Sequence, residues 1–232
     1  TKATCSPDST TNEIFLRILK FSPRNKNALK SLLLVNEKMK NFKKSKEIAQ
    51  ALEELNIDVS VEKVYFDTLI ILNDPILSYE KRTELLFEIF KENKIIQRIF
   101  ATFLIQSNRE FFFSNIDMFD CEKLIDILWY QKKEDIDFDK IKNNQFLNEL
   151  YSAKNYINSV SNSSDFDLNI LILINKYQKD IKTNLTFEFI CNSCKHSSPF
   201  YEARCPNCHS ILSLEVKHHL TKAYELSNQS LQ

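Results

Sequence analysis

Glycine is absent from the 232-residue sequence, although average usage would place about 16 glycines in a chain of this length. The phosphate-binding Walker loop, the dinucleotide-binding fingerprint and the G-x-S-x-G turn of many hydrolases all require glycine, so the sequence excludes these three motifs. Tight β-hairpins also favour glycine because their turns need positive φ angles, which argues against an all-β fold. The sequence also lacks any apolar run close to the roughly 18–20 residues of a membrane-spanning helix.

A net charge of one sign is missing as well, since 31 basic residues balance 31 acidic ones. This balance excludes a generally polyanion-binding composition, but it leaves room for a local patch. Hydrophobic residues make up 43% of the chain, which is enough for a sizeable core.

One stretch is locally basic, because ten basic residues between Arg17 and Lys46 face Glu37 alone. A solvated helical face explains such a stretch, and so does a surface for an acidic partner or for the inner face of a membrane. Under the second interpretation, eight of these residues are candidates for binding a partner: Arg17, Lys20, Arg24, Lys26, Lys30, Lys40, Lys43 and Lys44.

Four of the six cysteines lie within 18 positions near the C-terminus, as two C-x2-C pairs separated by ten residues: Cys191, Cys194, Cys205 and Cys208. A two-residue spacer lets one tight turn direct both sulfurs of a pair at the same ion, and two such turns complete a tetrahedral shell of thiolates. The spacing therefore predicts a metal site. Two disulfides are the less favoured alternative, because nothing in the sequence indicates a secreted protein. A redox site is also less favoured, because it needs a single C-x-x-C pair at the start of a helix.

The predicted metal is zinc or iron, because four thiolates suit both ions. The short polar spacer and the lack of an evident redox partner favour structural zinc over iron. A closed shell leaves no open position for water, so we expect no catalysis at the metal. His196 and His209 adjoin the ligands, and we expect them to be exposed because the shell is already full. We also expect His218 and His219 to be solvated on a C-terminal helix.

Apolar residues at helical spacing predict a mainly α fold. The predicted helices cover residues 9–20, 26–39, 42–55, 61–72, 79–93, 94–107, 109–117, 121–131, 144–160, 166–180 and 218–230. Alternating residues at 186–190 and 211–216 predict short strands beside the cysteine pairs. We therefore predict a helical domain over residues 1–183, a four-cysteine metal-binding ribbon over 184–217 and a C-terminal helix or tail over 218–232.

The predicted helical hairpin at residues 23–55 resembles a tetratricopeptide repeat. Two patterns carry the resemblance: Pro23-x-Asn25-x-x-Ala28-Leu29-x-x-Leu32 and Asn41-Phe42-x-x-Ser45-x-x-x-Ala49. The repeat family places small residues where its two helices touch, and Ala28 and Ser45 occupy those positions. The resemblance implies a helical solenoid, which buries the Phe-rich and Leu-rich stripes of the later helices between neighbouring helices.

The cysteine module resembles the rubredoxin-type domain of the lipopolysaccharide assembly protein B family, which places this module after tetratricopeptide repeats. Residues 189–194 and 199–208 carry the resemblance, with Phe200 and Tyr201 as the aromatic segment before the second cysteine pair. Members of that family usually have glycine directly after the first pair, where this chain has Lys195.

This resemblance implies a non-enzymatic adaptor with protein partners in a bacterial inner-membrane process such as lipopolysaccharide assembly and its regulation. It also implies a cytoplasmic chain tethered to the inner membrane by an N-terminal segment that this sequence does not contain. One alternative is a chaperone or assembly factor for another membrane complex, such as a flagellar motor or a secretion system. Two further alternatives are a nucleic-acid-binding zinc ribbon and an enzyme or electron carrier. Nucleic acid is the less favoured partner because the module itself has little basic character.

Overall fold

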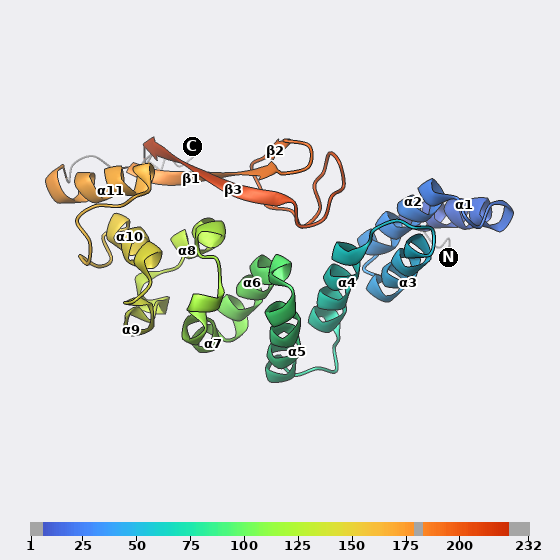
Figure 1. Cartoon of the computed structure of the whole chain (residues 1–232), viewed down its shortest axis with the longest axis horizontal. Helices are drawn as coiled ribbons and strands as arrows, with labels where there is room; N and C mark the ends of the chain where they lie inside the picture. Colours follow the sequence, from blue (N-terminus) through green and yellow to red (C-terminus); the bar gives the residue numbers. More distant parts are fainter. Residues whose placement is uncertain (1–6, 179–182, 223–232) are drawn as a thin grey trace, which may run out of the picture. The chain divides into compact units, whose positions relative to one another are not determined.

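The computed structural model describes residues 7–178 and 183–222. Most of these residues are helical, and a small sheet lies near the C-terminus (Figure 1), which confirms the prediction of a mainly α chain. Among these residues, no helix combines the length and the apolar character that crossing a membrane requires. The chain divides after Ile96 into two compact units, which are described separately below.

The first unit is a succession of helices, each packed mainly on its neighbours in the chain. These helices are α1 (Pro7–Phe21), α2 (Lys26–Lys38), α3 (Phe42–Glu53), α4 (Ser60–Asn73) and α5 (Tyr79–Glu92), followed by the short 3-10 helix η1 (Lys94–Ile96). Their bounds agree with the predicted helices to within a few residues. The exception is the predicted helix over 94–107, whose first turn is η1.

The α2–α3 hairpin shows how the local sequence specifies this packing. Asn25 and Asn41 cap the two helices, because each side-chain oxygen accepts the backbone N–H three residues later, at 3.0 and 3.4 Å. Ala28 and Ser45 are 3% and 0% exposed, and the Ser45 hydroxyl donates to the backbone oxygen of Leu33 on the facing helix. The predicted contact of Ser45 with the facing helix is therefore confirmed, and Ala28 is buried. A repeat array beyond this hairpin stays a prediction.

The second unit begins at Gln97 and contains shorter helices. They are α6 (Gln97–Ser107), α7 (Arg109–Ser114), η2 (Ile116–Met118), η3 (Glu122–Leu124), α8 (Ile125–Trp129), η4 (Lys133–Asp135), α9 (Phe138–Ile141), α10 (Gln145–Ala153) and α11 (Phe166–Tyr177). Their core contains both aliphatic and aromatic side chains, and the ring centroids of Phe112 and Phe119 lie 5.0 Å apart. The predicted helix over 144–160 is too long, because Asn155 adopts a φ of 57° that ends α10.

Three antiparallel strands complete the second unit: β1 (Thr183–Cys191), β2 (Ser197–Ser198) and β3 (Leu214–Lys222), in the spatial order β2-β1-β3. In Figure 1, β1 and β3 form a long hairpin that passes α11 and α8, and both helices contact it. Phe189 pairs with Val216, and Cys191 pairs with Leu214. This register places the first cysteine pair at the end of β1, just before the chain turns into β2.

The predicted helix at residues 218–230 is wrong for residues 218–222, which belong to β3 and pair with β1. The predicted solvation is wrong for His218 as well, whereas His219 is exposed as predicted. His218 is half-buried, with Nε2 3.1 Å from an oxygen of Asp165 at the start of α11. His219 Nε2 lies 3.1 Å from an oxygen of Glu188 on β1. Strand pairing separates the two rings onto opposite faces of the sheet. Residues 223–230 lie outside the described residues.

The division of the chain also differs from the predicted boundary between residues 183 and 184. Helices from Gln97 onward form one compact unit with the sheet that carries the cysteines. The reason is burial: Leu185, Phe189 and Leu214 on one face of the sheet are covered, and α8, α11 and η3 contact its strands. The cysteine module is therefore packed into a larger unit rather than appended to a finished helical domain.

Candidate metal centre

The first cysteine pair forms a tight turn at the end of β1. The N–H of Lys195 donates to the backbone oxygen of Cys191 at 2.8 Å. The N–H of Cys191 donates to the backbone oxygen of His196 at 2.9 Å. We call this turn a knuckle. The two hydrogen bonds fix the backbone, so that the sulfurs of Cys191 and Cys194 can point at one ion.

The second pair repeats the same knuckle. The N–H of His209 donates to the backbone oxygen of Cys205 at 3.0 Å, and the N–H of Cys205 donates to that of Ser210 at 2.9 Å. These bonds span the same numbers of residues as in the first knuckle. An isolated bridge between Arg204 and Ile211 closes the base of this turn. Two equivalent knuckles therefore face each other across the tetrad.

Each knuckle contains one residue in the left-handed backbone region directly after its second cysteine. Lys195 has a φ of 61° and His209 a φ of 63°. This conformation costs an ordinary residue about 1–2 kcal/mol, whereas glycine adopts it without a clash. The chain therefore keeps the knuckle geometry without the residue that suits it best.

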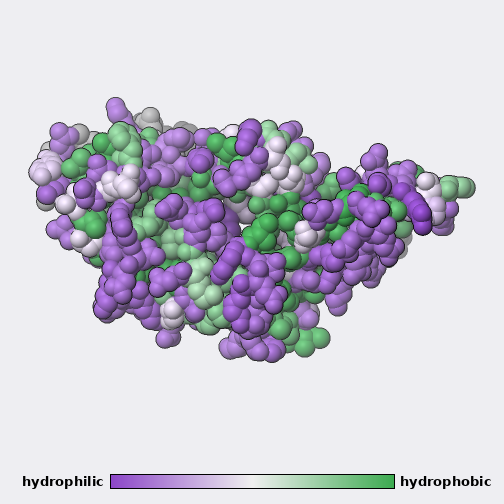
Figure 2. Space-filling view, in the orientation of Figure 1, coloured by the Kyte–Doolittle hydropathy of each residue, from purple (hydrophilic) through white to green (hydrophobic). Residues whose placement is uncertain are grey.

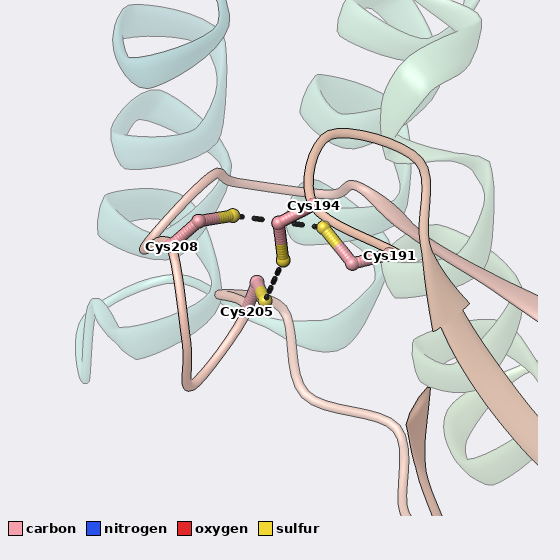
Figure 3. Close-up of side chains that lie close together, drawn as sticks. All are labelled: Cys191, Cys194, Cys205 and Cys208. Atoms are coloured by element: carbon pink, nitrogen blue, oxygen red, sulfur yellow. Dashed lines mark hydrogen bonds between the residues drawn. The ribbon is translucent and has the colours of Figure 1, made fainter. Parts of the chain in front are cut away.

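The four sulfurs form one cluster. All four Sγ atoms lie within 4.8 Å of one another, and Figure 3 shows the side chains converging from the two knuckles. Sγ–Sγ distances are 3.6 Å between Cys191 and Cys208 and 3.7 Å between Cys194 and Cys205. A disulfide bond measures about 2.05 Å, so the cysteines are not paired in that way. A tetrahedral shell with metal–sulfur bonds near 2.3 Å spaces its sulfurs about 3.8 Å apart, which the observed distances fit.

Polar side chains outside the tetrad support three of its sulfurs. Each places a polar atom 3.3–3.5 Å from a cysteine sulfur: Ser213 at Cys191, Asn207 at Cys194 and Ser210 at Cys208. The Asn207 amide donates to the Cys194 sulfur, whereas the Cys208 thiol donates to the Ser210 hydroxyl. A hydrogen bond donated to a sulfur orients it as a metal ligand and spreads its negative charge, so Asn207 helps to orient Cys194.

Burial and hydrogen bonding shift the pKa values of the cysteine thiols in different directions. Burial raises the pKa of Cys191, but the Ser213 hydroxyl and nearby backbone N–H groups outweigh it and bring that pKa down to about 6. Burial raises the pKa of Cys205 to about 11. The Ser210 side chain and backbone lower the pKa of Cys208. Because all four ligands of a metal must be thiolates, metal binding displaces the proton of Cys205.

The tetrad is a closed set of ligands. His196 and His209 are exposed, as predicted. Three or more His, Cys, Asp or Glu side chains can share a metal ion when their ligand atoms lie close together. Within the described part of the chain, the four cysteines are the one group that meets this condition. Four sulfur ligands suit zinc and iron alike. With every position occupied by protein, an ion bound here supports structure and has no site for a water nucleophile.

The loop between the two cysteine pairs contacts the helices through Arg98 on α6. The guanidinium carbon lies 4.1 Å from the ring centre of Tyr201 and 5.2 Å from that of Phe189. The guanidinium also donates to both carboxylate oxygens of Asp126 on α8, at 3.0 Å from Nη1. The Arg98 and Asp126 side chains are only 13% and 11% exposed. We call these four residues the Arg98 contact.

No pattern in the sequence predicts the Arg98 contact. Arg98 stands in a stripe of phenylalanines that predicted only a core helix, and Asp126 is 28 residues further along. The adjacent aromatic residues Phe200 and Tyr201 were the one available signal. The structure separates them, since Phe200 is exposed while Tyr201 packs on Phe189 and Arg98.

The eight basic residues predicted to bind a partner are all exposed and belong to the first unit, whereas the tetrad belongs to the second. Arg17 and Lys20 lie on α1, Arg24 in the α1–α2 turn, Lys26 and Lys30 on α2, Lys40 in the α2–α3 turn, and Lys43 and Lys44 on α3. Lys44 forms an exposed ion pair with Glu47, which contributes little to stability.

Replacing Cys205 and Cys208 together by Ser will abolish metal binding. Zinc content, measured by atomic absorption, is expected to fall from about one ion per chain to none. The cysteine module is expected to unfold, because metal-binding free energy is folding free energy in such small modules. Circular dichroism will then show a lower melting temperature. The control is Cys121→Ser, a buried cysteine outside the tetrad, which keeps its zinc. Unchanged zinc and melting temperature in the double variant would contradict the site.

Replacing Lys195 by Gly will stabilise the zinc-loaded chain, because glycine relieves the left-handed conformation after the first pair. We expect a gain of up to about 1 kcal/mol in the free energy of unfolding in urea. The matched control is Lys217→Gly in β3, where the same replacement destabilises a strand. Equal effects of the two replacements would show that the conformation of Lys195 carries no cost.

Two comparisons of the sequence with known proteins found no match. No protein-family model matches the chain, and no curated protein is significantly similar to it. The chemistry of the tetrad therefore rests on its residues: four thiolates at the spacing of a tetrahedral shell, held by two equivalent knuckles and packed against helices.

Proposed function

We propose that this chain is a non-enzymatic scaffold for protein partners. Zinc in the four-cysteine site holds a small module that braces helices of the second unit, and helices of the first unit dock the partners. The Arg98 contact carries this proposal, because it joins the loop between the cysteine pairs to α6 and α8. The closed ligand shell supports a structural role for the ion.

The ion would replace a hydrophobic core that the module lacks. The buried cluster around the tetrad consists of Phe189, Leu214 and two of the ligands themselves, Cys191 and Cys205. A module of this size does not bury enough apolar surface to fold alone. Coordination of four thiolates supplies the missing free energy and fixes both knuckles at once.

The bracing would act through Tyr201. Cys194 and Cys205 hold the two ends of the loop at the ion, and the Tyr201 ring between them covers the Arg98 guanidinium. Ring and cation attract each other most strongly where water is excluded. The ring also shields the Arg98–Asp126 ion pair, whose side chains are nearly buried. Occupancy of the tetrad is thereby linked to the Arg98–Asp126 ion pair that joins α6 to α8.

The helices of the first unit would provide the docking surface. Stacked helical hairpins present extended faces that typically bind proteins. The exposed basic residues on and between α1, α2 and α3 favour an acidic partner. The resemblance to the lipopolysaccharide assembly protein B family supports a partner at the bacterial inner membrane, which stays part of this proposal.

Replacing Tyr201 by Ala will separate bracing from metal binding. The variant keeps all four cysteines and about one zinc per chain, but its free energy of unfolding in urea falls by about 2–4 kcal/mol. Far-UV circular dichroism follows the helices. The matched control is Phe200→Ala, since the neighbouring ring is 74% exposed, and it changes the free energy by less than about 0.5 kcal/mol. A similar decrease in the free energy of unfolding for both variants would contradict the bracing role.

Affinity capture of the zinc-loaded chain from its native membrane, after cross-linking, will recover a defined protein partner. Changing Lys40, Lys43 and Lys44 to Glu is expected to lower that recovery at least about tenfold, because it reverses the charge of the proposed surface. The matched control changes Lys132, Lys133 and Lys142 to Glu on the second unit. Equal recovery with both triple variants would contradict this docking surface. Salt-dependent RNA or DNA binding, or iron with reversible reduction, would contradict the scaffold itself.

A further inference from the structure

Helix α1 exposes an apolar stripe that its neighbour α2 does not cover. Ile14, Ile18 and Phe21 are 52%, 38% and 92% exposed, and their spacing of four and three residues places them on one face of the helix. Phe15 and Leu19, at different positions around the helix, are half-buried instead. Leu16, on another side of the helix, is also 41% exposed and lies outside the stripe. Asn12 accepts a hydrogen bond from Asn36 of α2, which fixes the packed side of α1.

Basic side chains surround this stripe. Arg17 and Lys20 are exposed on α1 itself, and Arg24 and Lys26 are exposed where the chain turns into α2. Two backbone hydrogen bonds in the turn, from Ser22 to Ile18 and from Asn25 to Ser22, hold this corner beside the end of α1. Glu13 is the one acidic residue between positions 10 and 30. Figure 2 shows apolar and hydrophilic residues intermixed over α1, at the right of the view.

The size and charge of this surface favour a membrane over a folded partner. Three apolar side chains bury at most a few hundred Å², whereas a stable protein interface buries about 800 Å² on each partner. A bilayer needs no such area, because shallow insertion of a few apolar side chains adds to the attraction between cations and anionic headgroups. Phe21 is suited to that insertion because it projects almost fully into solvent.

We propose that the α1 corner, made of Ile14, Ile18 and Phe21 with the cations Arg17, Lys20, Arg24 and Lys26, docks on an anionic lipid bilayer. The three apolar side chains enter the boundary between headgroups and acyl chains, while the four cations face lipid phosphates. This inference goes beyond the scaffold role, since it assigns a membrane-contacting surface to the chain itself. It depends neither on the metal nor on the Arg98 contact.

Co-sedimentation of the zinc-loaded full chain with lipid vesicles tests this proposal. The chain is expected to bind vesicles of phosphatidylcholine with about one-third phosphatidylglycerol, but not pure phosphatidylcholine, and to bind more weakly as salt rises. Phe21→Ser should weaken binding at least about tenfold. Arg17→Gln and Lys20→Gln should each weaken it about fivefold.

Two control variants match these changes elsewhere in the chain. Ile76→Ser removes an apolar side chain that is 90% exposed in the same unit. Lys132→Gln with Lys142→Gln removes two exposed cations from the other unit. Both controls should bind vesicles as the wild type does. Because every replaced side chain is exposed, circular dichroism should show unchanged helix content in all variants.

Three results would overturn the proposal. The first is an absence of binding to anionic vesicles, and the second is equal binding by Phe21→Ser and Ile76→Ser. The third is a dimer, detected by light scattering, that Phe21→Ser converts to a monomer, since the stripe would then be an interface between copies of the chain. These results leave the scaffold proposal intact, because its tests measure zinc, the free energy of unfolding and captured protein.

Discussion

Convergence of four cysteine sulfurs on one point is the constraint on which the C-terminal part of this structure depends. Two equivalent knuckles bring the sulfurs to the spacing of a tetrahedral shell, and the pairing of Cys191 with Leu214 holds the first knuckle at the end of the β1–β3 hairpin. Strand register and ligand geometry thus specify the same arrangement. The apolar cluster around the tetrad is too small to do so alone. An ion in the site supplies binding free energy where an ordinary domain would use a larger core.

Because the chain contains no glycine, other residue types adopt the left-handed backbone conformations beside the cysteine pairs. Six residues in the described ranges adopt positive φ without being glycine: Lys40, Asn56, Asn155, Lys195, His209 and Leu212. Asparagine tolerates this conformation, whereas lysine, histidine and leucine adopt it at a cost of about 1–2 kcal/mol each. Three of these residues, Lys195, His209 and Leu212, follow a cysteine pair within a few positions. Structural zinc sites contribute roughly 10–16 kcal/mol, so a zinc ion bound at the tetrad would outweigh this backbone strain.

The Arg98 contact joins the cysteine module to helices α6 and α8. An ion pair that is nearly buried is a weak source of net stability, because desolvation offsets the attraction between its charges. Its value here is geometric: the guanidinium fits one carboxylate and two aromatic rings at the same time. The α1 corner is different in kind, since its cations and apolar side chains are exposed. The Arg98 contact and the α1 corner therefore involve separate residues and separate physics.

Sequence patterns by themselves determined the features that depend on neighbours along the chain. The cysteine spacing predicted the tetrad because a knuckle is a local turn, and helical periodicity predicted α2 and α3 because apolar stripes repeat within a few residues. Tertiary structure alone decided that residues 218–222 form a strand, since pairing with β1 outweighs their local helical pattern. It also decided the Arg98 contact and the packing of the sheet on α8 and α11. Those contacts join residues far apart in sequence, and no local pattern records which distant side chain will cover a buried charge.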